Sequence, residues 1–86
     1  METLTLNDGT VLENSSAVVS RDLFLYIMGM TMAEVFNLLI VPGKVEKIIF
    51  TQINGDKVIY EEFTKLTAVR DEGDGLVTAV LQKAVE

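Results

Sequence analysis

The pattern of apolar and polar positions along the chain predicts six strands and one helix. Alternation with a period of two indicates strands, and clusters of Gly, Asn, Asp and Ser mark the turns between them. The strands are expected at residues 2–6, 10–19, 23–28, 47–53, 57–70 and 76–81. Asn7-Asp8-Gly9 and Asn54-Gly55 connect neighbouring strands as hairpins, the second with a type I′ turn.

Polar residues interrupt two of the predicted strands. Glu13-Asn14-Ser15-Ser16 divides the second strand, where we expect a bulge or a bend. Glu61 and Glu62 interrupt the fifth strand and place Phe63 on the opposite parity from Tyr60. A bulge at the two glutamates would allow both aromatic side chains to reach the core.

A single helix is predicted over residues 32–41. Thr31 and Glu34 have the spacing of a capping box at its start, and Pro42 ends it because proline disfavours helical backbone at the preceding residue. Hairpin connections make the sheet antiparallel. With the helix packed on one face of this sheet, the chain forms one α+β domain over residues 1–86, in the order ββ-β-α-ββ-β.

One apolar stretch, Leu23 to Val41, is about long enough to span a bilayer. Glu34 and Asn37 lie in its second half, and a carboxylate near the centre of a span costs about 2.5 to 3.5 kcal/mol. We therefore expect a strand and a buried helix here, not a membrane segment. Because the first residues lack the basic and apolar regions of a secretory signal, a cytoplasmic location is expected.

Composition narrows the possible functions. The 86 residues include no cysteine and no histidine, which removes disulfides, thiolate and imidazole catalysis, and the usual zinc ligands. The net charge of −6 disfavours direct nucleic-acid binding. No P-loop, dinucleotide fingerprint or nucleophile elbow is present. We expect a non-enzymatic protein without cofactor or small-molecule substrate, and a chain this short gains most from a partner subunit.

The predicted helix is the strongest candidate for an interaction site. Its polar stripe contains only Thr31, Glu34 and Asn37, so the helix is apolar on nearly all sides, and a sheet covers only one of them. The open flanks would bind another protein or a second copy of the chain, unless sheet curvature and loops cover them. The candidate residues are Met32, Val35, Phe36, Leu39 and Ile40.

Methionines gather near the start of this helix. Met28, Met30 and Met32 lie around Gly29 and either fill the core or offer an adaptable apolar surface to a partner.

Acidic residues support two alternative hypotheses. The first is a cation-binding module at the loop 71–74, although its spacing does not match an EF-hand and a solvated hairpin loop is the favoured interpretation. The second is an acidic inhibitor that imitates the charge of nucleic acid, which requires the carboxylates to form one ridge. These carboxylates are Glu61, Glu62, Asp71, Glu72 and Asp74. Glu61 and Glu62 are also expected to protect a strand edge from aggregation.

Several short segments together resemble small uncharacterised proteins encoded in prophages of Gram-positive bacteria. They are residues 6–10, Tyr26-Ile27, residues 29–36, Pro42 with Lys44, Asn54-Gly55 and residues 74–77. The resemblance implies a phage accessory or morphogenesis-associated protein, in the host cytoplasm or on the virion. It carries no catalytic residues over to this chain.

Overall fold

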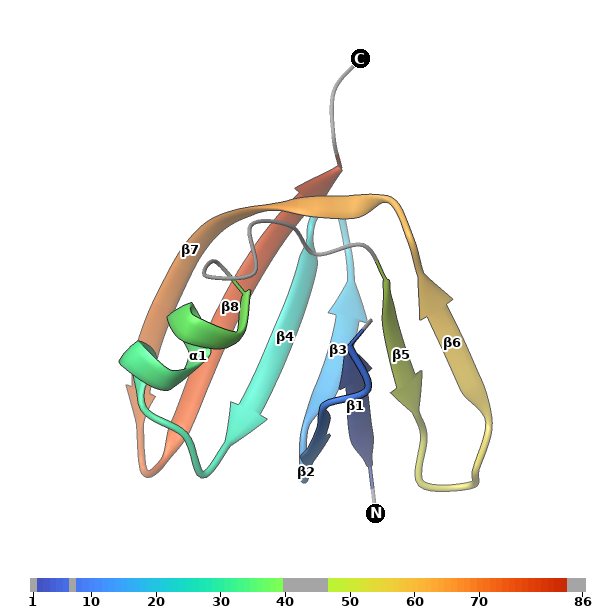
Figure 1. Cartoon of the computed structure of the whole chain (residues 1–86), viewed down its shortest axis with the longest axis horizontal. Helices are drawn as coiled ribbons and strands as arrows, with labels where there is room; N and C mark the ends of the chain where they lie inside the picture. Colours follow the sequence, from blue (N-terminus) through green and yellow to red (C-terminus); the bar gives the residue numbers. More distant parts are fainter. Residues whose placement is uncertain (1, 7, 40–46, 84–86) are drawn as a thin grey trace.

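The computed structural model describes residues 2–6, 8–39 and 47–83, which form eight strands in two antiparallel sheets and one helix. The first sheet has the strand order β2-β1-β5-β6, and the second has the order β3-β4-β8-β7 (Figure 1). The first sheet contains β1 (Thr3–Leu6), β2 (Val11–Glu13), β5 (Ile48–Thr51) and β6 (Lys57–Tyr60). The second contains β3 (Ser16–Val19), β4 (Leu23–Met28), β7 (Phe63–Gly73) and β8 (Leu76–Lys83), and the helix is α1 (Met32–Leu39).

The predicted α+β class and antiparallel pairing are confirmed, but the single sheet of about six strands is wrong. The two extra strands arise at the two polar interruptions, because each predicted long strand divides there and its halves join different sheets. At the first corner, between β2 and β3, Asn14 has a positive φ of 53°. The buried Ser15 fixes this corner: its backbone N–H donates to the Glu2 carbonyl at 3.2 Å and its hydroxyl to the Glu13 carbonyl at 3.0 Å.

The second corner joins β6 to β7, and it lies where a bulge within one strand was predicted. Glu61 and Glu62 lie between two strands of different sheets, so they do not interrupt one continuous strand. Both aromatic neighbours do reach the core, as predicted: Phe63 is buried, and Tyr60 packs against the core with the two rings edge to face, 6.2 Å between centroids. The parity change between them therefore comes from the change of sheet.

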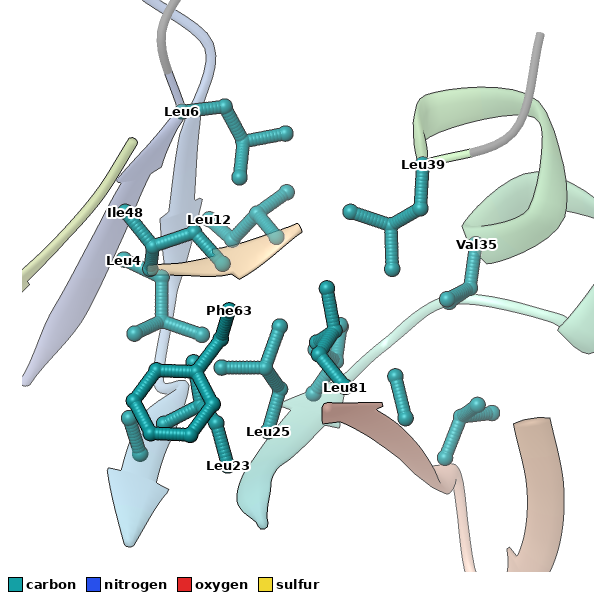
Figure 2. Close-up of a cluster of buried hydrophobic side chains, with 14 of the residues drawn as sticks. Leu4, Leu6, Leu12, Leu23, Leu25, Val35, Leu39, Ile48, Phe63 and Leu81 are labelled. Atoms are coloured by element: carbon teal, nitrogen blue, oxygen red, sulfur yellow. The ribbon is translucent and has the colours of Figure 1, made fainter. Parts of the chain in front are cut away.

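The core lies between the inner faces of the two sheets. Large aliphatic side chains from both sheets are fully buried there, among them Leu4, Leu25 and Ile48 (Figure 2). The helix packs against β7 and β8 and adds Val35 and Leu39 to the same cluster. Two sheets thus enclose the core, and the helix completes it from the side of β7 and β8 (Figure 1).

The start of the helix follows the predicted capping box. The Glu34 N–H donates to the Thr31 hydroxyl at 3.1 Å, and the Thr31 N–H donates to the Glu34 carboxylate at 3.0 Å. The helix begins at Met32, as predicted, and is described to Leu39; the predicted continuation to residue 41 lies outside the described residues. In the described part of the chain, no helix is long and apolar enough to cross a membrane.

The types of two hairpin turns differ from the prediction. At residues 52–56 the Gly55 N–H donates to the Gln52 carbonyl and only Gly55 has positive φ, so Asn54-Gly55 belongs to a three-residue loop and the predicted type I′ turn is wrong. The type I′ turn is instead Asp74-Gly75, where both residues have positive φ (54° and 80°). β7 consequently extends to Gly73, beyond the predicted end at residue 70.

Candidate interaction surfaces

Most of the helix flank is buried in the core. Val35 and Leu39 are buried at 0% and 3% exposure, so neither side chain is offered to a partner. Met32 is partly buried and packs against the core, whereas Phe36 is 39% exposed. Ile40 lies outside the described residues. Of the four predicted residues that the structure describes, Phe36 is therefore the one left substantially on the surface.

The three methionines divide in the same way. Met30 and Met32 are partly buried and pack against the core, while Met28 is 44% exposed at the end of β4. Two of the three therefore fill space around the core, and they do not form one continuous exposed patch.

The outer face of the first sheet carries two rows of side chains that cross all four strands. Pairing aligns the first row as Val11, Thr5, Ile49 and Ile59, which we call the apolar row. The second, which we call the charged row, is Glu13, Thr3, Thr51 and Lys57. Leu4 and Leu12 point to the core from the alternate positions, so both rows face away from it.

Side chains at both ends of these rows are open to solvent. Val11 is 53% exposed at one end of the apolar row and Ile59 is 51% exposed at the other. Glu13 and Lys57 are exposed at the two ends of the charged row. Sequence reasoning missed this face, although the period-two pattern contained the signal: Ile59 lies between Val58 and Tyr60, which point to the opposite side.

The outer face of the second sheet is also apolar, but it is better covered. Val18, Phe24 and Val80 align across β3, β4 and β8, with Val18 51% exposed and Val80 only 8% exposed. In the next row Thr78 lies between Tyr26 and Arg70 and is 2% exposed. Its hydroxyl is buried and has no hydrogen-bond partner among the residues that the structure describes. Large side chains on the neighbouring strands thus bury the middle of this face without help from a helix.

The acidic residues do not form one ridge. Glu61 and Glu62 precede β7, whereas Asp71 and Glu72 lie near its other end (Figure 1). The two ends of β7 pair with Lys83 and Leu76 of β8, which are roughly 20 Å apart at the usual rise of a strand. Glu62 forms an exposed ion pair with Lys83 at 3.3 Å. The Asp71 carboxylate accepts the Gly73 N–H at 2.9 Å, a bond internal to the end of the strand.

Nor do the acidic residues gather as ligands for a cation. Within residues 2–6, 8–39 and 47–83, no three acidic side chains come together as metal ligands would. The geometry therefore adds no support to the cation-binding hypothesis at 71–74.

A shallow hollow of about 290 Å³ lies at the second corner. Its lining is a single consecutive segment, residues 59–63. The hollow is thus the concave side of the bend from β6 to β7, and it brings together no groups from separate elements. It provides neither a convergent set of polar groups nor an enclosed chamber of the kind that binds a small molecule.

Compared with known proteins, the chain matches no protein-family model, no curated protein and no solved structure.

Proposed function

We propose that this chain is a non-enzymatic interaction protein that binds another protein or a second copy of itself. The observation that carries the proposal is the amount of large apolar side chain left on the surface of so small a fold. In the part of the chain that the structure describes, seven such side chains are at least 39% exposed. They are Val11, Val18, Val19, Met28, Phe36, Ile53 and Ile59. Where such side chains gather into one patch, the surface is typical of sites that become buried on association.

The resemblance to prophage-encoded proteins supports a role as a phage accessory or morphogenesis-associated protein, in the host cytoplasm or on the virion. Its alternative, an acidic inhibitor that imitates nucleic acid, is less well supported because the carboxylates lie in two groups at opposite ends of β7. Binding through an apolar surface agrees with the exposed side chains and needs no particular arrangement of acidic residues.

Phe36 provides the first test, because it is the exposed member of the predicted helix flank. We expect the parent chain to run above the mass of one chain in size-exclusion chromatography with light scattering. A shift toward the monomer in Phe36→Glu would place the helix flank in the contact between copies. Asn37→Glu adds the same charge at the next exposed residue of the helix and is the matched control. A parent that remains monomeric at every concentration contradicts self-association, and equal effects of the two variants contradict a role for Phe36.

A further inference from the structure

We propose that the outer face of the first sheet binds the same face of a second copy of the chain. This inference rests on the proposed function and names its partner. The face carries the apolar row and the charged row described above. Its central strands, β1 and β5, run antiparallel, with β2 and β6 outside them. Each row therefore has its two ends on the two edge strands of the sheet.

The two rows are self-complementary under a simple rotation. A two-fold axis that runs along the strands, between β1 and β5, places β2 of one copy opposite β6 of the other. Glu13 then lies opposite the second copy's Lys57, and this pairing occurs twice. In the same arrangement Val11 lies opposite the second copy's Ile59, so apolar side chains meet apolar side chains.

The distances suit this arrangement. Sheets packed face to face lie about 10 Å apart, a gap that a glutamate and a lysine side chain can bridge together. Within one chain, Glu13 and Lys57 are separated by three strand spacings, about 14 Å, so they cannot pair with each other there. Any energetic coupling between these two residues must therefore arise between copies.

The outer face of the second sheet lacks this property. Its polar row runs from Ser16 on β3 through Tyr26 and Thr78 to Arg70 on β7. The same rotation would place Arg70 opposite a serine, without a carboxylate to receive its charge. Charge complementarity thus favours the first sheet over the second as the surface for a second copy.

The area of the face determines how strongly two copies are expected to associate. Four strands of about four residues cover roughly 20 by 14 Å, which is small beside the interfaces of permanent dimers. The net charge of −6 on each copy also opposes association. We therefore expect a reversible dimer that forms in the range from about 10 μM to about 1 mM.

Charge reversal tests the pairing, with sedimentation velocity of the full chain as the assay. Glu13→Lys and Lys57→Glu should each raise the dimer Kd about tenfold, because each replaces two attractive pairs by two repulsive ones. The double variant Glu13→Lys/Lys57→Glu restores opposite charges and should return the Kd to within about twofold of the parent value.

The two single variants also separate local pairing from overall charge. Glu13→Lys changes the net charge from −6 to −4, and Lys57→Glu changes it to −8. If only overall repulsion mattered, the first variant would tighten the dimer and the second would weaken it. Weakening by both variants, with recovery in the double variant, is expected only from pairing between copies.

A second pair of variants tests the apolar row. Ile59→Thr should weaken the dimer and leave the melting temperature of the monomer nearly unchanged, since Ile59 is already 51% exposed. Val18→Thr is the matched control, because Val18 is equally exposed and β-branched but belongs to an edge strand of the second sheet. A dimer lost in Val18→Thr and kept in Ile59→Thr would overturn the assignment.

Other outcomes distinguish this inference from the proposed function. A dimer that persists in both charge variants but dissociates in Phe36→Glu would overturn the first-sheet face and leave self-association in place. A parent chain that is monomeric up to about 1 mM would overturn this inference and leave binding to a different protein as the proposed function. Failure of the double variant to recover would overturn the pairing of Glu13 with Lys57.

Discussion

The buried hydroxyl of Thr78 makes a substitution predictable in sign as well as in size. Thr78 is 2% exposed on β8, between Tyr26 and Arg70 on the neighbouring strands. Within residues 2–6, 8–39 and 47–83, its Oγ1 atom has no hydrogen-bond partner. Burial without a partner costs about 1 to 3 kcal/mol, because the hydroxyl gives up its bonds to water and receives nothing in return. Thr78→Val replaces this hydroxyl by a methyl group of similar size and should remove the cost.

We expect Thr78→Val to raise the free energy of unfolding by about 1 kcal/mol, the lower end of that range, because the unfolded state also changes. For a chain of this length the corresponding rise in Tm is about 4 to 8 °C. Urea unfolding followed by circular dichroism measures the first quantity and a thermal scan measures the second.

Thr78→Ser is the informative control for this prediction. It keeps the hydroxyl and removes the buried methyl group, so it should destabilise the fold by about 1 kcal/mol. Opposite signs for the two variants would identify the hydroxyl as the unfavourable group. If Thr78→Val is less stable than the parent, the hydroxyl has a partner after all and the reasoning fails.

Two further predictions concern local hydrogen bonds. Thr31→Ala removes the hydroxyl that accepts the Glu34 N–H and should lower the free energy of unfolding by about 1 kcal/mol in a urea titration. Thr31→Ser keeps a hydroxyl and should retain most of this stability. Equal losses of stability in the two variants would contradict the capping role. The Thr10 N–H donates to the Asp8 carboxylate at 2.9 Å, and this bond holds the pKa of Asp8 below its ordinary value of 3.8. A lowered folded-state pKa means that the bond stabilises the fold above the ordinary pKa and that this contribution is lost as the pH falls through the folded value. NMR titration of the Asp8 carboxyl should therefore give a midpoint below 3.8, and a midpoint at or above that value would contradict the bond.

The sequence alone determined the local structure well, because local structure depends on neighbouring residues. The capping box at Thr31 and Glu34 needs only two side chains and the backbone between them, and it forms as predicted. The strand over 23–28 was likewise predicted with its observed bounds, because an apolar run between polar breaks specifies a buried strand. The residue order also predicted that Phe63 and Tyr60 both reach the core despite their opposite parity, as they do.

The turn types show where local reasoning begins to fail. Asn54-Gly55 has the composition of a type I′ turn but forms part of a three-residue loop, and Asp74-Gly75 forms the type I′ turn instead. Both dipeptides tolerate either geometry, so the strand register decides between them.

Only the tertiary structure decided how many sheets the strands form and which side chains remain outside. A polar break such as Glu61-Glu62 fits a bulge within one sheet and a corner between two equally well, because either one changes the parity of the following residues. The presence of two sheets also decides which side chains are exposed. Val35 and Leu39 are buried in the core, while the apolar row that contains Ile49 and Ile59 remains on the surface. Burial depends on what packs against a residue from far along the chain, and the residue order does not contain that information directly.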